Sequence, residues 1–440
     1  MKKMISFLGT NEYLDCYYEI NDFTSSQTRF IQTALYEMLK QEGTQIDKVY
    51  IFLTKEAKEN NFLDCVSNVT KKPLIGLENV WNEKFKHDDI ELIPIMMNSN
   101  QLEKNQWELF EQIYDKIEEN DEIYFDITHS FRSNPIIALI IANFAKTLKN
   151  ATLKRLFYGN FEALGPAYKV RNISVEKRIA PIVDITSMLE LLDWTIAVDT
   201  FLRTGNPVQI VELADDKSRL FNRDPGFQAI RYFAGALNNF NISLETVRGP
   251  DLNNKINNVL DKYPKLEKHK TGIFPQFEKL TNKIEDKLTN FSNDEVKNKL
   301  GTVIWANEHG LYQQSITLLS EHIISIIAEN YGVNVKDIDS RLKISGLLQE
   351  LIKEKNKSNS DSNKNHIKNI KINEEELKLY LEDLIETYPE LKTYEKLATL
   401  RNDINHAGYR EAYKNPDTIK KNIDKYIDDL TPFFKKLIKD

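Results

Sequence analysis

The sequence predicts an N-terminal α/β domain followed by an all-α region. The chain has 440 residues, roughly two to three times the commonest domain size, so two domains are expected. From Met4 to about Ala180, short β-type runs alternate with amphipathic helical stretches. Beyond Val183 the hydrophobic period becomes about 3.6 residues and strand signals largely vanish. The predicted fold class is therefore α/β plus all-α, with a Rossmann-like, doubly wound parallel sheet first.

Runs rich in β-branched and aromatic residues predict strands at 5–8, 49–53, 92–96, 123–127 and 153–158. Between them, apolar residues repeat at helical spacing over 30–39 and stop at Gly43, a natural helix end. The stretch 107–117 has the same spacing. This β-α-β order predicts mainly parallel strands with helices on both faces.

The second half of the chain shows helical spacing over 188–201, 316–327 and 377–384. Two polar tracts interrupt it. The tract 251–271 is rich in Asn and Lys, and 353–371 has almost no apolar residue and is expected to be a flexible loop. We expect one domain at 1–184 and an all-α region at 185–440.

Composition excludes several classes of protein. With 59 Lys and Arg against 66 Asp and Glu, the net charge is -7, so a broad basic surface for nucleic acid is not expected, and a polyanion would need a local site. No apolar run approaches the roughly 18 residues of a membrane span, and the run after Met1 is too short for a signal peptide. Only Cys16 and Cys65 are present, which fits a reducing cytoplasm.

The carboxyl ends of parallel strands are where ligands bind in such a sheet. Gly9, Thr10 and Asn11 follow the first predicted strand. A denser set follows the fourth: Thr128, His129, Ser130, Phe131 and Arg132. Asn134-Pro135 then predicts a helix start, whose free N–H groups favour anions.

This second set predicts recognition of phosphate and base. The alternative is that Thr128 and Ser130 cap the turn, that His129 is a structural histidine and that Phe131 lies in the core. The density of polar groups favours ligand binding. Neither G-x-G-x-x-G nor a Walker motif is present in the sequence, so NAD binding and ATP hydrolysis are not expected.

The segment 397–408 carries the second candidate site. On a helix, Leu397, Leu400 and Ile404 form one core-facing stripe. An adjoining polar flank carries Arg401, Asn402, Asn405 and His406. Arg401 and His406 are about 140° apart on the helix, so a partner helix would be needed to gather both.

An Arg and a His suffice for metal-independent RNA cleavage. An imidazole can assist the 2′-hydroxyl or protonate the leaving 5′-oxygen, and a guanidinium stabilises the charge on the phosphate. The alternative is a solvated helical face, because this spacing is common by chance. No His-containing metal motif is present in the sequence, so no metal site is expected.

Together the two sites resemble the CARF-HEPN ancillary ribonucleases of type III CRISPR systems. The resemblance rests on residues 7–11, 126–132 and 401–406, with support from 306–314, which looks like an earlier helix of the HEPN bundle. It spans nearly the whole chain and puts the HEPN core at about 300–440. In one departure, Ser130 and Phe131 stand where relatives often carry a Gly.

The resemblance implies a sensor domain that dimerises and binds a cyclic oligoadenylate, which activates RNA cleavage between two HEPN domains. The sensor residues implied are Gly9, Thr10, Asn11, Thr128, His129, Ser130, Phe131 and Arg132. Arg401 and His406 would be catalytic, with Asn402 and Asn405 as positioning groups. A ring of four adenylates is favoured and a ring of six is the alternative.

The implied partners are a second copy of the chain, or an oligomer of dimers, and single-stranded RNA. No cofactor, DNA or membrane partner is expected. Two other functions compete with this one: a nucleotide-binding regulator in which Arg401 and His406 are only surface residues, and a HEPN-type toxin that is active without any ligand.

Overall fold

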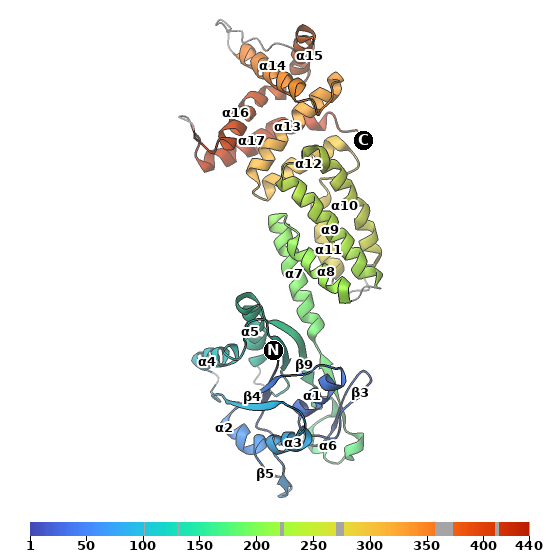
Figure 1. The fold of residues 1–440 in the computed structure, drawn as a ribbon, viewed down its shortest axis with the longest axis vertical. Helices are drawn as coiled ribbons and strands as arrows, with labels where there is room; N and C mark the ends of the chain where they lie inside the picture. Colours follow the sequence, from blue (N-terminus) through green and yellow to red (C-terminus); the bar gives the residue numbers. More distant parts are fainter. Residues whose placement is uncertain are drawn as a thin grey trace. The chain divides into compact units, whose positions relative to one another are not determined.

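The computed structural model describes residues 1–100, 102–129, 133–220, 224–269, 277–356, 373–409 and 413–439. The chain forms two compact units, Met1–Glu190 and Leu191–Asp440 (Figure 1). The sequence places the boundary at residue 184, which is the last residue of strand β10. Each unit has its own core.

Among the described residues of unit 1, eight strands form one sheet in the order β3-β2-β10-β9-β8-β1-β4-β7. Their bounds are β1 Lys2–Leu8, β2 Tyr17–Ile20, β3 Phe23–Thr24, β4 Lys48–Leu53, β7 Glu91–Met96, β8 Glu122–Asp126, β9 Thr152–Gly159 and β10 Ile179–Asp184. A separate small ribbon pairs β5 (Cys65–Val66) with β6 (Pro73–Leu74).

The five predicted strands are β1, β4, β7, β8 and β9, and every neighbouring pair among them is parallel. The sheet as a whole is mixed, because β10 runs antiparallel to β9 and β3 runs antiparallel to β2. Strands β2 and β3 have only four and two residues, and β10 contains Pro181, so these three strands gave no clear signal.

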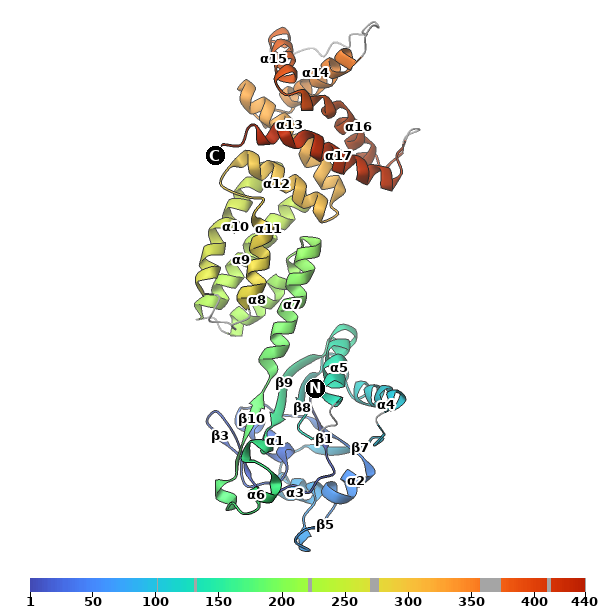
Figure 2. The same cartoon turned by 180° about the vertical axis from the view of Figure 1, so that it is seen from behind.

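Helices cover both faces of the sheet, as predicted for a doubly wound fold. The helices of unit 1 are α1 Ile31–Gln41, α2 Lys55–Ala57, α3 Leu77–Lys84, α4 Glu103–Tyr114, α5 Asn134–Lys149 and α6 Ala167–Val170. Met4 and Leu8 of β1 belong to the core that α1 and α3 cover. Ile5 and Phe7 belong to the core under α4 and α5, as strand alternation requires. Both views place α4 beside α5 (Figure 2).

Unit 2 is helical around one apolar core. Its helices are α7 Thr186–Thr204, which begins in unit 1, then α8 Val208–Leu220, α9 Pro225–Glu245, α10 Gly249–His269, α11 Phe277–Leu288, α12 Glu295–Glu308, α13 Tyr312–Tyr331, α14 Ile338–Asn356, α15 Glu374–Thr387, α16 Tyr394–Asn405 and α17 Pro416–Lys435. The described part of the chain contains no helix with the length and apolarity of a membrane span.

The prediction that 251–271 interrupts the helical region was wrong. Helix α10 runs through most of this tract, with Leu252, Ile256, Val259, Tyr263 and Leu266 buried. Their spacing alternates between four and three residues, which gives an apolar stripe that the Asn- and Lys-rich composition conceals. Of the other tract, 353–356 ends α14, and 357–371 lies outside the described residues.

Candidate functional site

The first candidate site lies where three neighbouring strands of unit 1 end. Strands β8, β1 and β4 are adjacent and parallel, so the loops that follow them leave the sheet at one edge. Gly9 to Asn11 follow β1, and Thr128 and His129 follow β8, so the structure brings the two predicted loops together. A third loop segment, Asn60 and Asn61 after β4, was missed.

Asn60 and Asn61 lie on a π-helical turn, Lys58–Phe62, and hold the loop after β1. The Asn61 Nδ2 donates to the carbonyl oxygens of Gly9, at 2.9 Å, and Asn11, at 2.8 Å. The Asn60 Nδ2 donates to the carbonyl oxygen of Thr10 at 3.2 Å. The backbone of this loop is therefore fixed, while the side chains of Thr10 and Asn11 are exposed and free to meet a ligand. The position of the Asn pair after a strand was the signal that could have found it.

Tyr13 joins the loop after β1 to the loop after β8. Its ring stacks on the imidazole of His129, with centroids 4.1 Å apart. Its hydroxyl oxygen accepts a hydrogen bond from the Gly9 N–H at 2.7 Å. A Cβ at Gly9 would lie 2.9 Å from that hydroxyl, so the glycine makes room for Tyr13.

The His129 ring is neutral at physiological pH. Burial lowers the pKa of His129 to about 4. Its Nε2 atom is buried and has no hydrogen-bond partner among the described residues. A buried ring nitrogen without a partner is costly unless something else bonds it, so this atom marks a position that a ligand can fill.

The Thr128 hydroxyl makes its hydrogen bonds to other groups of the protein. Its hydroxyl donates to the Asp126 Oδ1 at 2.5 Å and accepts from the Gly159 N–H at 2.7 Å. Asp126 is fully buried and also accepts from the Ser6 hydroxyl at 2.6 Å; burial raises the pKa of this carboxyl. These bonds give the Thr128 hydroxyl the turn-capping role that the sequence left open.

The rest of the predicted sensor set cannot be placed. Ser130, Phe131 and Arg132 lie outside the described residues. Helix α5 follows them, beginning at Asn134 with Pro135 in its first turn, as the Asn-Pro pair predicts.

The second candidate site lies at the end of α16. Leu397 and Leu400 are fully buried and Ile404 packs against the same core, so the predicted core stripe is confirmed. The helix ends at Asn405, and His406 is the residue directly after it. Ala407 and Gly408 follow with φ values of +53° and +71°, a left-handed turn that ends the helix.

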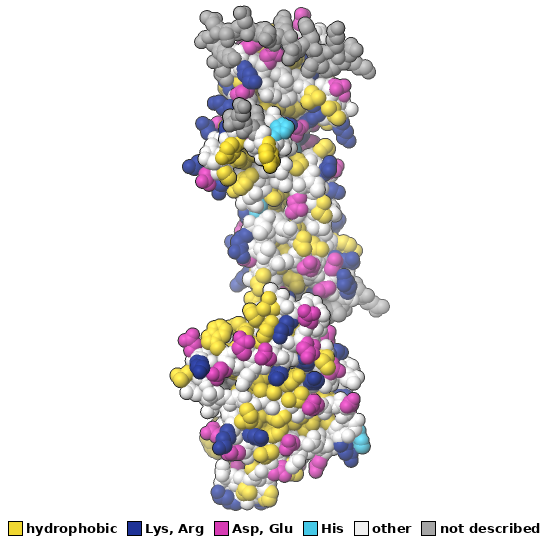
Figure 3. Space-filling model, turned by 60° about the vertical axis from the view of Figure 1, so that its left-hand side comes forward, with side chains coloured by type: hydrophobic (Ala, Val, Ile, Leu, Met, Phe, Trp, Pro, Cys, Tyr) yellow, Lys and Arg dark blue, Asp and Glu magenta, His cyan; other side chains and the backbone are white. Residues whose placement is uncertain are grey.

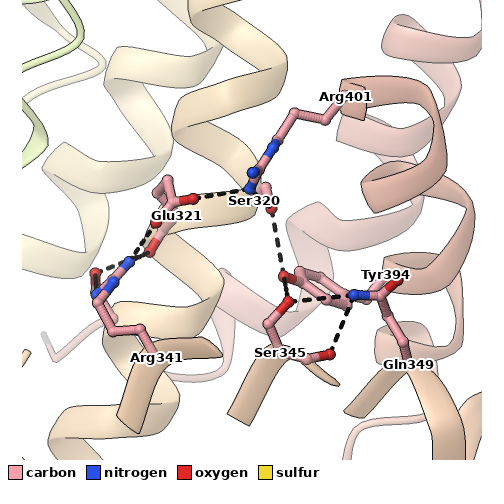
Figure 4. Close-up of polar contacts among 8 residues, drawn as sticks. Ser320, Glu321, Arg341, Ser345, Gln349, Tyr394 and Arg401 are labelled. Carbon is pink, nitrogen blue, oxygen red and sulfur yellow. Dashed lines mark hydrogen bonds and ion pairs between the residues drawn. The ribbon is translucent and has the colours of Figure 1, made fainter. Parts of the chain in front are cut away.

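The predicted catalytic residues differ in their surroundings. Arg401 is half-buried, and its Nη1 donates to the Glu321 Oε1 at 2.8 Å and to the Ser320 hydroxyl at 3.4 Å (Figure 4). Asn402, Asn405 and His406 are exposed. No contact between Arg401 and His406 is seen among the described residues of one chain, which agrees with their separation on the helix.

The supporting segment 306–314 is a helix-turn-helix junction. Helix α12 ends at Glu308 and α13 begins at Tyr312. The Gln313 Nε2 donates to the Asn405 Oδ1 at 3.4 Å. The segment therefore reaches the exposed end of α16, although its middle is a turn. Among the residues that the structure describes, no cluster of His, Cys, Asp or Glu is placed to hold a metal ion.

Two models of known protein families match parts of this chain. Residues 3–162 match the family model of the CARF domain of the CRISPR system endoribonuclease Csx1. Residues 190–298 match the model of the second domain of the CRISPR-associated protein MJ1674. The chain therefore carries a domain similar to the CARF domain of a CRISPR endoribonuclease, followed by a region similar to the second domain of another CRISPR-associated protein.

One relative by sequence is the CRISPR-associated protein MJ1674 of Methanocaldococcus jannaschii. It is 30% identical over 113 residues, which are 26% of this chain and 16% of that protein. The match thus spans under a fifth of the relative's length.

Proposed function

We propose that this protein is an RNA endonuclease of type III CRISPR defence that a cyclic oligoadenylate activates. One observation carries the proposal: a CARF unit, whose known relatives include an endoribonuclease, is followed in the same chain by a helix that presents Arg401, Asn402, Asn405 and His406 at its end. In this proposal the first unit senses the activator and the second, a HEPN domain, cleaves RNA.

The edge of the sheet supplies groups suited to a cyclic oligoadenylate. The exposed side chains of Thr10 and Asn11 can bond phosphate or base. His129 is neutral and stacked on Tyr13, and its Nε2, which has no partner among the described residues, would bond a base edge. Ser130, Phe131 and Arg132 complete the proposed cleft, with the guanidinium as the phosphate ligand. The favoured ring has four adenylates, with six as the alternative.

Cleavage would proceed without a metal ion. The 2′-hydroxyl attacks the adjacent phosphate, the bond from phosphorus to the 5′-oxygen breaks, and a cyclic phosphate and a free 5′-hydroxyl result. His406 moves the proton at the attacking or the leaving oxygen, and Arg401 stabilises the extra negative charge. Asn402 and Asn405 position the RNA. Two copies of the site, one from each chain, would supply both proton-transfer roles.

A homodimer would use an exposed apolar stripe of α5. Ile136, Ile140, Phe144 and Leu148 recur every four residues on this helix and are 62%, 53%, 43% and 56% exposed. On the neighbouring α4, Trp107 is 60% exposed. Figure 3 shows hydrophobic side chains gathered on one face of unit 1. A continuous exposed apolar stripe is typical of an interface. A second copy of the chain would present the same stripe, related by two-fold symmetry.

The test is RNA cleavage by the full chain in EDTA, with and without cyclic tetraadenylate or cyclic hexaadenylate. Wild type should cut single-stranded RNA faster with one of the rings. His406→Ala should cut about 10²-fold more slowly or worse while binding the ring with unchanged affinity. If neither ring stimulates cutting, the chain is a non-enzymatic regulator or a ligand-independent toxin. Cutting by wild type without any ring, lost in His406→Ala, would indicate the toxin.

A further inference from the structure

A polar seam crosses the apolar core of unit 2 where α13, α14 and α16 meet (Figure 4). Its members are Ser320 and Glu321 from α13, Arg341, Ser345 and Gln349 from α14, and Tyr394 and Arg401 from α16. They are linked by hydrogen bonds and ion pairs. A polar network inside an apolar core lowers stability unless its members satisfy one another.

Arg341 holds Glu321 in place. The Arg341 Nη2 donates to the Glu321 Oε2 at 2.6 Å and to the Glu321 carbonyl oxygen at 3.1 Å. The Arg341 Nη1 donates to the Ser325 hydroxyl at 2.9 Å and to the Val335 carbonyl oxygen at 3.0 Å. The Arg341 side chain is only 17% exposed. The fold thus uses both terminal nitrogens of Arg341, and the Glu321 carboxylate has little freedom to move.

The second acceptor of Arg401 is also fixed. The Ser320 hydroxyl lies 3.4 Å from the Tyr394 hydroxyl, which lies 3.0 Å from the Ser345 hydroxyl. Tyr394 is 1% exposed. Arg401 and Tyr394 are seven residues apart, which is about two helical turns, so they lie on the same face of α16. The guanidinium of Arg401 is therefore held at Nη1 by two acceptors that are themselves held.

The seam leaves Arg401 able to bind an anion. Two guanidinium groups share the one carboxylate of Glu321, so the three side chains keep a net charge of about +1 at neutral pH. The hydrogen bonds described for Arg401 come from Nη1, and its buried Nε has no partner among the described residues. The Arg401 side chain is 29% exposed, so a phosphate would approach the exposed part of the guanidinium rather than the buried Nε.

We infer that Glu321 is a positioning residue for RNA cleavage: anchored by Arg341, it holds the Arg401 guanidinium at Nη1 and leaves the exposed part of that group for the RNA phosphate. The inference rests on the proposed function. A guanidinium that is fixed before the substrate binds stabilises the transition state better than one that must be ordered during the reaction.

The test compares Glu321→Gln with a matched control, Glu329→Gln, in the full chain. Glu329 lies on the same helix, is 43% exposed against 40% for Glu321, and is ion-paired with Lys299. Cleavage is measured with the activating ring in excess. We expect E321Q to lower kcat by about 10- to 100-fold with KM within about twofold, and E329Q to behave as wild type. In the Arg401→Ala background, E321Q should slow cleavage no further, because it acts through Arg401.

The outcomes separate the two proposals. If wild type does not cut RNA, the proposed function fails. If wild type cuts and E321Q matches E329Q, only the positioning role is overturned. Faster cleavage by E321Q also overturns it, because Glu321 would then block Arg401. If E321Q unfolds at a lower temperature than E329Q, Arg341→Lys is tested in its place. This variant keeps the positive charge but loses the two terminal guanidinium nitrogens that donate the hydrogen bonds of Arg341. A lower kcat again supports the positioning role of Glu321, and an unchanged kcat overturns it.

Discussion

The ring of Tyr13 lies 4.1 Å from the imidazole of His129, with the two planes 18° from parallel. The two residues come from the loops after β1 and β8, which are neighbours in the sheet. The stack therefore fixes one loop against the other, and the Tyr13 hydroxyl fixes the Gly9 backbone at the same time. The candidate sensor edge is thus assembled before any ligand binds.

Removal of the Tyr13 hydroxyl should destabilise the protein. Tyr13→Phe keeps the stack on His129 but leaves the partly buried Gly9 N–H without its acceptor. We expect a loss of about 1–3 kcal/mol in the free energy of unfolding, measured by urea denaturation at pH 7. Tyr168→Phe is the control, because Tyr168 is 69% exposed, and it should change stability by less than about 0.5 kcal/mol. Equal urea midpoints for Y13F and Y168F would contradict the role of the hydroxyl.

A methyl group at Gly9 should weaken activator binding. Its Cβ would lie 2.9 Å from the Tyr13 hydroxyl, so Tyr13 and the stacked His129 must shift. We expect Gly9→Ala to bind the activating ring at least about tenfold more weakly, a loss of about 1.4 kcal/mol, by calorimetry. Gly235→Ala is the control, since nothing lies within 4 Å of a Cβ at Gly235. If G9A binds as tightly as G235A, the ligand does not use this edge.

Acid should destabilise unit 2 through His322. This histidine is 3% exposed, and burial, with Lys299 and Arg341 nearby, lowers its pKa to about 3. The unfolded chain takes up the proton near pH 6.5. The stabilising contribution is therefore fully present above about pH 6.5 and is lost as the pH falls toward 3, at about 1 kcal/mol per pH unit. The free energy of unfolding of His322→Gln, measured from pH 7 to pH 4, should fall less steeply than that of wild type. Parallel curves for the two proteins would show that His322 does not titrate as argued.

A charge on the α5 stripe should dissociate the proposed dimer. Ile140 is 53% exposed, so Ile140→Glu should not disturb the folded monomer but would bury a carboxylate in the interface, which is unfavourable by several kcal/mol. Light scattering after size exclusion should give a dimer mass for wild type and a monomer mass for I140E. Leu379→Glu changes a residue of α15 that is 67% exposed and should stay dimeric. A dimeric I140E would place the interface elsewhere.

Much of the fold was predictable because its signals are local. The five parallel strands are runs of apolar β-formers, and α1, α4, α13 and α15 show plain helical periods. Helix α10 was missed because its apolar stripe is diluted by Asn and Lys, so composition masked the period. Strands β2 and β3 were missed because strands of four and two residues depend on their partners rather than on their own sequence, and β10 was missed because Pro181 interrupts its pattern.

The candidate sites were only partly predictable, because some of their contacts join residues that are far apart in the sequence. The rule that ligands bind beyond strand ends found Gly9 and His129, and it would also have found Asn61 had it been applied to the third loop. The pairing of Arg401 with Glu321 joins residues 80 positions apart. No local pattern specifies which helices will meet, so only the packed structure assigns Glu321 to this site.

The most direct test of the composite nuclease site is complementation between two inactive chains. Arg401→Ala and His406→Ala chains with different tags are co-expressed, the mixed dimer is purified through both tags, and RNA cleavage is measured in EDTA with the activating ring. If the site forms between two chains, it keeps one arginine and one histidine. The mixed dimer should then cut at least about tenfold faster than either parent, since loss of one group costs about 10²-fold or more. A mixed dimer that is no faster than its parents would contradict a site shared between two chains.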